Sequence, residues 1–285
     1  MLLASNLSRI PWLVHGFSTR QGGVSRAYGK DDLNLGYTKD DRRTYAARNR
    51  GIFLSAVGCG GDRKRTPWPL VTLRQVHSDV ILRVDGVENK DLIGDGLVTD
   101  TPGLLLAIQT ADCLPIVLVD RKRRAVGVFH AGWRGTVKRI VEKGVGAMRL
   151  HFGSRAGELV ATIGPGIHEC CYEVGEEVRD KFLSQFEYGS DLFRELAESD
   201  PVREKYPLLF LTARAPGHTY GVLPKKIFLD LVEANRRQLL AAGVKAKNIE
   251  ASPLCTNCHP ELLFSYRAEK GKTGRMMAVV GIKPG

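Results

Sequence analysis

The sequence predicts an α+β fold: a single domain over residues 1–285, with mixed β-sheets flanked by helices. Many short apolar runs, bounded by glycine, proline or charged residues, indicate buried strands. A few longer segments carry apolar residues at helical spacing. Strands and helices do not alternate strictly along the chain, so a doubly wound parallel sheet is not expected.

The strands are the clearest pattern in the chain. Most are runs of four or five apolar residues, the length expected of a strand buried on both faces. Because such runs lie between turn-forming residues, their ends are well defined. The predicted strands are Val71–Leu73, Val80–Val84, Leu104–Ile108, Ile116–Val119, Val126–Phe129, Leu159–Ile163, Phe264–Tyr266 and Ala278–Ile282.

Four segments show the spacing of amphipathic helices. Thr136 can cap one of them, while Pro224 in a first turn and Gly243 after a last turn suit another. Residues 58–69, rich in glycine, proline and charge, are the best candidate for a loop, and Glu187–Tyr220 has a weaker pattern expected at the surface. The predicted helices are Tyr45–Val57, Thr136–Leu150, Val174–Phe186 and Pro224–Ala242.

The composition is that of a soluble globular protein, with 43% hydrophobic and 26% charged residues. No apolar run approaches the roughly 20 residues needed to span a bilayer, and the N-terminal sequence is too short and polar for a signal peptide. Six cysteines without regular spacing favour reduced thiols over a disulfide scaffold. We therefore expect a cytoplasmic monomer or homodimer with no membrane partner.

The net charge of +11 raises the question of nucleic-acid binding. The basic residues are dispersed, however, apart from clusters at 62–67 and 120–125, and each cluster is expected in a polar turn beside a strand. Nucleic acid is therefore an unlikely partner. A small polyanionic substrate such as phosphate fits a basic protein equally well.

Three residues that can bind a metal ion each stand at the end of an apolar strand. His130 follows AVGVF, Cys113 ends LLLAIQTADC, and His77 lies in LVTLRQVHS. Two imidazoles and one thiolate with a vacant fourth position are typical of a catalytic zinc site, which lowers the pKa of a bound water to about 7. The sequence therefore predicts Zn²⁺ bound by these three residues.

The same residues leave three alternatives open. A His₂Cys set also matches copper, but the chain has seven histidines, no His-x-His pair and no methionine near these motifs, so a multicopper polyphenol oxidase is the less favoured assignment. In a cysteine hydrolase, Cys113 would be the nucleophile, His130 or His77 would activate it, and Asp112 would orient that histidine. A non-catalytic metal- or RNA-binding protein is the third, although Asp112 and Arg134 beside the vacant position favour catalysis.

Two glycine-containing segments could bring backbone close to a ligand. In HGFSTRQGGVS, at residues 15–25, Arg20 precedes paired glycines whose N–H groups could approach an oxyanion. The pattern favours a simple hairpin turn, since it is neither a Walker loop nor a dinucleotide fingerprint. In IGPGIHECCYEVG, at residues 163–175, His168 and Glu173 are weaker acid–base candidates.

The motif CTNCHPE, at residues 255–261, contains a CxxCH sequence. This is the attachment motif of c-type haem, but no export signal accompanies it. A zinc deaminase needs His-x-Glu before its Pro-Cys-x-x-Cys segment, and here the order is reversed. A structural role for Cys255, Cys258 and His259, or a second metal site with Cys170 or Cys171, is the preferred interpretation.

Taken together, the motifs resemble one family. QVHS, DGLVTD, TADCLPIVLVD, HAGWRGT, IGPGI and CCYEVG occur in this order, preceded by STRQGGVS with LNLG and followed by FSYR with TGRM. From about Gly16 to Ile282 the chain resembles the YfiH or laccase-domain family. The resemblance implies a zinc-dependent phosphorylase of adenosine, inosine, guanosine and 5′-methylthioadenosine, with adenosine deaminase activity in the same pocket.

The resemblance also implies roles for particular residues. Purine nucleosides and inorganic phosphate would be the substrates, with Asp112, Cys113 and His130 in the catalytic group. Gly96 and Ala268 depart from the family pattern, whereas the metal motifs are intact. Beyond the ligands His77, Cys113 and His130, the expected substrate or phosphate contacts are Arg20, Asn34, Gln75 and Arg134.

Overall fold

The computed structural model describes residues 1–61, 66–86, 91–197, 205 and 225–285. These residues form mixed parallel and antiparallel sheets with helices packed on them, which confirms the α+β class. They divide into a larger compact unit, residues 1–168 with 231–285, and a smaller one, residues 169–230. One domain over the whole chain stays a prediction. No helix in the described part of the chain combines the length and apolarity needed to cross a membrane.

The larger unit is built around a six-stranded sheet in the order β13-β9-β7-β8-β5-β4. Its central strands β7 and β8 pair antiparallel, with Leu114 opposite Ala131, and every residue of both is buried. Strands this apolar form where a sheet is covered on both faces. The bounds are β4 Ile81–Arg83, β5 Gly96–Thr99, β7 Leu114–Asp120, β8 Ala125–Ala131, β9 Leu159–Ile163 and β13 Ile249–Ala251.

A second, four-stranded sheet packs against the first, in the order β1-β14-β6-β3. Alternate residues of β6 face opposite ways: Leu106 and Ile108 enter the core between the sheets, and Leu105 and Ala107 enter a second core on the outer face. Burying each of these leucine and isoleucine side chains stabilises the fold by about 1.5–3 kcal/mol. The bounds are β1 Leu13–Phe17, β3 Leu70–Val71, β6 Leu105–Thr110 and β14 Met276–Ile282, with the short β2 Gln21–Ser25 outside both sheets.

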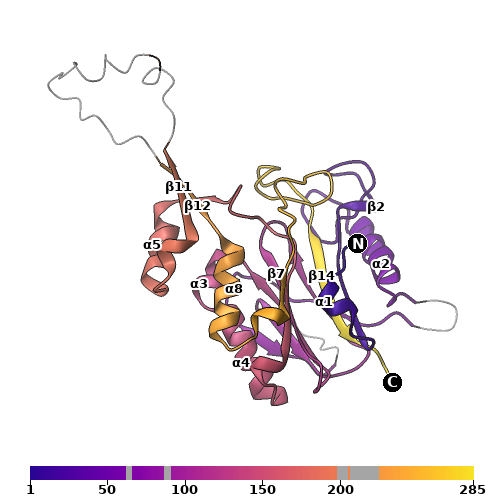
Figure 1. Cartoon of the computed structure of the whole chain (residues 1–285). Coiled ribbons are helices and arrows are strands. Elements are labelled where there is room, and N and C mark those ends of the chain that lie inside the picture. The colour runs from indigo at the N-terminus through magenta and orange to yellow at the C-terminus, as the bar shows by residue number, and fades with distance from the viewer. Residues whose placement is uncertain (62–65, 87–90, 198–204, 206–224) are drawn as a thin grey trace. The chain divides into compact units, whose positions relative to one another are not determined.

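Helices cover the outer faces of the two sheets. In Figure 1, α3, α4 and α8 lie on one side of β7, and α2 lies beyond β14 on the other. Helix α4 can approach β8 closely because a Cβ at Gly144 would lie only 2.8 Å from the Phe129 ring. The bounds are α1 Ser5–Ser8, α2 Arg43–Ala56, α3 Trp133–Val137, α4 Ile140–Phe152 and α8 Leu231–Ala241, with 3₁₀ turns at Ala156–Glu158 and Ala246–Asn248.

The described residues of the smaller unit include a three-stranded antiparallel sheet, in the order β10-β12-β11, and the helix α5. Phe182 packs edge-on against Phe193, with ring centroids 5.8 Å apart. The bounds are β10 Glu173–Val174, α5 Glu176–Gln185, a 3₁₀ turn at Gly189–Leu192, β11 Phe193–Ala197 and β12 Lys225–Leu229. Residues 198–204 and 206–220 of the segment with the weaker pattern lie outside the described residues.

Two helix predictions need correction. Thr136–Leu150 is two helices, because Arg139 adopts a left-handed conformation at φ 64° between them. Thr136 lies inside the first of these, where its hydroxyl accepts a hydrogen bond from Asn235 instead of capping a helix. The first half of Pro224–Ala242 is a strand, since Lys225–Leu229 pairs on both edges with β10 and β11; Pro224 itself lies outside the described residues.

The strand predictions were more accurate. All were confirmed to within a few residues except Phe264–Tyr266, which is a loop whose Phe264 is fully buried. That burial explains the apolar signal without a strand. Besides β12, six described strands were missed because glycine or polar residues interrupt or flank their apolar runs. They are Leu13–Phe17, Gln21–Ser25, Gly96–Thr99, Glu173–Val174, Phe193–Ala197 and Ile249–Ala251.

Candidate metal centre

The three predicted ligands come together at one end of the six-stranded sheet. His130 is the second-last residue of β8, and Cys113 immediately precedes β7. Because these strands pair antiparallel, the end of β8 meets the start of β7. His77 follows β3 in a turn and has φ 56°. The ligand atoms of all three residues lie within 4.8 Å of one another.

The contacts inside this cluster orient the rings. Cys113 Sγ lies 3.9 Å from His77 Nε2. The His77 and His130 rings meet edge-on, with centroids 4.9 Å apart and planes at 70°. His130 is 4% exposed, whereas His77 reaches solvent. The cluster therefore has one buried side and one open side.

Asp95, which directly precedes β5, holds two of the three residues in place. Its Oδ1 accepts hydrogen bonds from His130 Nδ1 at 2.8 Å and from the backbone N–H of His77 at 3.1 Å. Its Oδ2 accepts bonds from the N–H groups of Val76 and Ser78 and from the Ser78 hydroxyl. With Nδ1 bonded to Asp95, His130 presents Nε2 to the cluster, as carboxylate partners of metal-binding histidines do.

The charges in the cluster reinforce one another. Burial opposes ionisation of Cys113, but the charge of His130 and bonds from both imidazoles outweigh it and lower the pKa of the thiol to about 6. Burial likewise disfavours charged His130, yet Cys113 and Asp95 raise its pKa to about 9. Asp95 is fully buried, but bonds from His130 and Ser78 lower its pKa to about 2. Cys113 thus readily supplies the thiolate that metals bind.

Gly132 leaves the space that the cluster occupies. A Cβ at this position would lie 2.8 Å from Cys113 Sγ and 3.3 Å from His77 Cδ2. Any larger residue would therefore push the ligands apart. The donor set of one thiolate and two imidazoles, held against a glycine and open on one side, suits a catalytic zinc ion.

The open side faces a cavity of about 360 Å³. Arg74 and Arg275 both line it, and the described residues around it include no carboxylate. Arg74 is exposed, while Arg275 is half-buried with Nη1 donating to the carbonyls of Thr273 and Gly274. The cavity is therefore electropositive even without a metal and suits an anionic substrate.

Gln75, an expected substrate contact, lines this cavity, but its amide is used within the fold. Its Nε2 donates to the Gln109 carbonyl, and its Oε1 accepts from the Gln109 backbone N–H. These bonds join the loop before His77 to strand β6. Gln75 therefore shapes the cavity wall more than it offers free polar atoms.

Asp112 does not face the cavity. Its carboxylate accepts hydrogen bonds from the Thr256 and Ser265 hydroxyls and from the Arg267 N–H, at 2.6–2.7 Å. The residue itself is strained, at φ 91°. It thus anchors the C-terminal loop, and the acid that orients His130 is Asp95. Asp95 is the first residue of the motif DGLVTD, so that motif could have identified it as a residue of the site.

Arg20 is also committed to the fold. It forms a two-point pair with Asp32, through Nε at 3.2 Å and Nη2 at 2.9 Å, and donates from Nη1 to the Pro260 carbonyl. It lies 3.3 Å from Glu269 and 4.6 Å from the Phe264 ring centroid. Burial disfavours its charge, but the two carboxylates outweigh it and raise its pKa. The structure does not bring Arg20 to the cavity.

The remaining predicted contacts lie elsewhere. Asn34 is fully buried and bonds to Gly36 and Asp41. Arg134 is exposed and stacks on the Trp133 ring, 4.2 Å from its centroid. Neither lines the cavity. The cavity arginines Arg74 and Arg275 were missed, although Arg74 lies in LVTLRQVHS and Arg275 in TGRM; neither motif by itself shows that its arginine reaches the metal centre.

The CxxCH motif belongs to a turn of the larger unit. Cys255 is buried, and its Sγ accepts a hydrogen bond from the His168 N–H at 3.5 Å, whereas Cys258 is exposed. Cys170 and Cys171 belong to the smaller unit. A metal-binding role for these cysteines stays a prediction.

Comparison with known proteins gives consistent matches along the whole chain. A family model described as multi-copper polyphenol oxidoreductase laccase matches residues 14–283. A Deinococcus radiodurans protein named purine nucleoside phosphorylase is 36% identical over 285 residues, covering 99% of this chain and 92% of that protein. A protein named adenosine deaminase RL5, from an unknown prokaryotic organism, is 33% identical, covering 92% of this chain and 91% of that protein. The crystal structure of YlmD from Geobacillus stearothermophilus aligns with TM-score 0.77 at 32% identity, covering 99% of this chain and 94% of that one.

Proposed function

This chain belongs to the multi-copper polyphenol oxidoreductase laccase family, and within it we propose a zinc-dependent purine nucleoside phosphorylase that also deaminates adenosine. Its substrates would be adenosine, inosine, guanosine or 5′-methylthioadenosine, with inorganic phosphate. The observation that carries the proposal is the His77–Cys113–His130 cluster opening on an electropositive cavity. The names of the relatives support the same chemistry. A cytoplasmic location stays a prediction.

The metal would be held by His77, Cys113 and His130, with Asp95 orienting His130. When bound, zinc supplies Lewis-acid activation, of water for deamination or of a substrate oxygen for phosphorolysis. Copper oxidation is the weaker alternative, since a multicopper centre needs more ligands than this cluster offers. Gly132 supports the assignment because its lack of a side chain lets the Cys113 thiol and the His77 ring lie close together.

Phosphorolysis requires phosphate to attack C1′ of the ribose while the bond to the purine nitrogen breaks. We place the phosphate on Arg74 and Arg275, whose charges would be preorganised where the anion reacts. The Gln109 side chain lines the same cavity and can hydrogen-bond an edge of the purine. Because Arg20 and Asp112 are fully engaged in the fold, we assign neither to the reacting atoms.

The test is chromatography of zinc-loaded full-length protein incubated with adenosine or inosine, with and without phosphate. We expect phosphate-dependent release of adenine or hypoxanthine, and inosine formation from adenosine without phosphate. Cys113→Ala should reduce both to background, whereas Cys59→Ala, which removes a buried thiol that does not line the cavity, should keep them. Absence of all products from metal-replete protein would reject the purine assignment.

A second candidate rests on a specific geometry. Cys113, His130 and Asp95 also form the nucleophile, base and orienting acid of a cysteine hydrolase. That enzyme would work without metal and would be inactivated by iodoacetamide in its metal-free form. We expect chelation alone to abolish turnover. Ester hydrolysis by metal-free protein that iodoacetamide stops would favour the hydrolase instead.

A further inference from the structure

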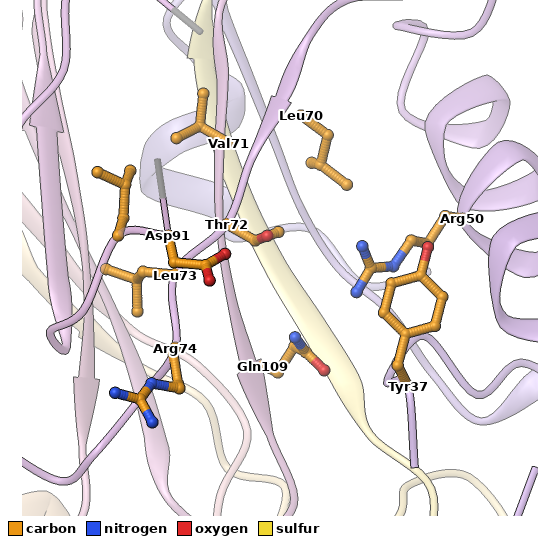
Figure 2. A pocket seen from close by; sticks show the side chains of 10 residues that line it. Tyr37, Arg50, Leu70, Val71, Thr72, Leu73, Arg74, Asp91 and Gln109 are labelled. Carbon is orange, nitrogen blue, oxygen red and sulfur yellow. The ribbon is translucent and has the colours of Figure 1, made fainter. Parts of the chain in front are cut away.

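The metal-centre cavity continues into a second one. The second cavity has a volume of about 400 Å³ and shares Leu73, Arg74 and Gln109 with the first. We call the two together the groove. Figure 2 shows Arg50 and Tyr37 entering the second cavity from one side, with the Arg50 guanidinium directed toward Thr72 and Gln109. A ligand at the metal centre can therefore extend along the groove toward Arg50.

Arg50 is a half-buried cation without an acidic partner among the described residues. Its Nε donates to the Leu35 carbonyl at 2.9 Å, and its Cζ lies 4.2 Å from the centroid of the Tyr37 ring. These contacts fix the plane of the guanidinium and leave its Nη groups directed into the cavity. Burial is the main cause that lowers the pKa of Arg50, with Arg43 adding to it and Tyr37 opposing it. A bound anion stabilises a partly desolvated cation of this kind more than it stabilises an exposed one.

The surroundings of Arg50 suit a phosphate group. Its fork of N–H donors matches two phosphate oxygens, and the Thr72 hydroxyl lines the same cavity as a further donor. Tyr37 is braced by Arg43, whose Cζ lies 4.6 Å from the ring centroid. Asp91 is the one carboxylate among the described lining residues, and it is exposed, so water screens its repulsion.

We propose that the Arg50 end of the groove is a second anion subsite, in which Arg50 and Thr72 bind a phosphate group. The phosphate can belong to a nucleoside 5′-monophosphate that spans the groove with its base toward the metal centre, or it can be inorganic phosphate. The inference rests on the proposed function only in taking the remainder of the ligand to be a purine nucleoside. The substrate class then extends from nucleosides to nucleotides.

Calorimetric titration of zinc-loaded full-length protein tests the subsite without any turnover. The probes are adenosine 5′-monophosphate, adenosine and inorganic phosphate. Arg50→Ala should weaken binding of a phosphate-bearing probe by at least about tenfold and leave adenosine unchanged. Arg48→Ala removes the same charge from an exposed position on the same helix and should have no effect.

The probes also identify the source of the phosphate. If Arg50→Ala weakens binding of adenosine 5′-monophosphate but not of inorganic phosphate, the ligand of the subsite is the nucleotide. If it weakens binding of inorganic phosphate but not of the monophosphate, the ligand is inorganic phosphate. Thr72→Val, on the opposite wall of the cavity, should weaken binding of the same probe. This second variant keeps the test valid if Arg50→Ala protein misfolds. Equal binding of both phosphate probes to wild-type, Arg50→Ala and Arg48→Ala protein would overturn the subsite. Because binding is measured directly, this result is independent of whether adenosine is cleaved.

Discussion

Asp95 and Asp112 are both buried aspartates at strand starts, yet they serve different regions. Asp95 bonds to the ring of His130 and the backbone of His77, so its carboxylate reaches the metal centre. Asp112 stands next to Cys113 in the sequence, but the hydrogen-bond donors to its carboxylate all belong to the loop at residues 256–267. The comparison shows that adjacency to a ligand along the chain says little about which acid serves the site.

Arg20 belongs to the same region as Asp112. It bonds to the Pro260 carbonyl and pairs with Glu269, which brackets the loop that Asp112 holds. We call Arg20, Asp32, Asp112 and Glu269 the loop anchor. Substitutions there should change stability, whereas substitutions at the metal centre should change metal affinity and catalysis. Four experiments test this separation.

The largest effect is expected at Arg20. Arg20→Met leaves Asp32 and Glu269 without their shared cation, and breaking a buried pair in this way costs about 3–5 kcal/mol. Urea unfolding monitored by circular dichroism measures the loss. Zinc affinity should stay unchanged. If the variant has normal stability but a higher KM for phosphate, Arg20 contacts the substrate and is not part of the scaffold.

Asp112→Asn should cost somewhat less. Asparagine keeps Oδ1 as the acceptor for the Thr256 and Ser265 hydroxyls but replaces the Oδ2 that accepts from the Arg267 N–H with an NH₂ group. Loss of one hydrogen bond to a charged group costs about 1.5–3 kcal/mol, so a total loss of about 3 kcal/mol is expected. The same unfolding assay applies, with the exposed Asp85→Asn as the control. A kcat that falls at unchanged stability would show that Asp112 acts in the reaction.

Zinc should stabilise the metal centre by a comparable amount. At a free zinc concentration a hundredfold above Kd, binding to the native state contributes about 2.7 kcal/mol. Calorimetric melting of chelated and zinc-loaded protein measures the increase in Tm. The increase should vanish in Cys113→Ala and persist in Arg20→Met; if Cys113→Ala keeps it in full, zinc stabilises the protein through other ligands.

The smallest effect is expected at Asp95. Asp95→Asn weakens the acceptor that orients His130, and loss of such a partner lowers metal affinity by about 10- to 100-fold. Competition with a chromogenic chelator gives the zinc affinity. Asp112→Asn is the matched control and should bind zinc as the wild type does. Equal affinities in the two variants would remove the distinction between the aspartates.

The sequence by itself determined the α+β class, the longest buried strands of the two larger sheets and the ligand types. Buried strands carry their own signal, since an apolar run that ends in His130 or Cys113 places a polar side chain at a sheet end. The three candidate ligands could be chosen for this reason, and the structure brings them together. Local pattern fails at Lys225–Leu229, which is a strand where a helix was predicted, because its apolar residues run almost directly into those of α8.

Only the tertiary structure decided the partners of the charged residues. Asp112 and Thr256 are 144 positions apart in the sequence, and Arg20 and Pro260 are 240 apart. A buried charge needs several partners because desolvation is costly, and those partners come from whichever segments the fold brings close. No local spacing encodes that choice, which is why Asp95, Arg74 and Arg275 emerged at the site while Asp112 and Arg20 became parts of the scaffold.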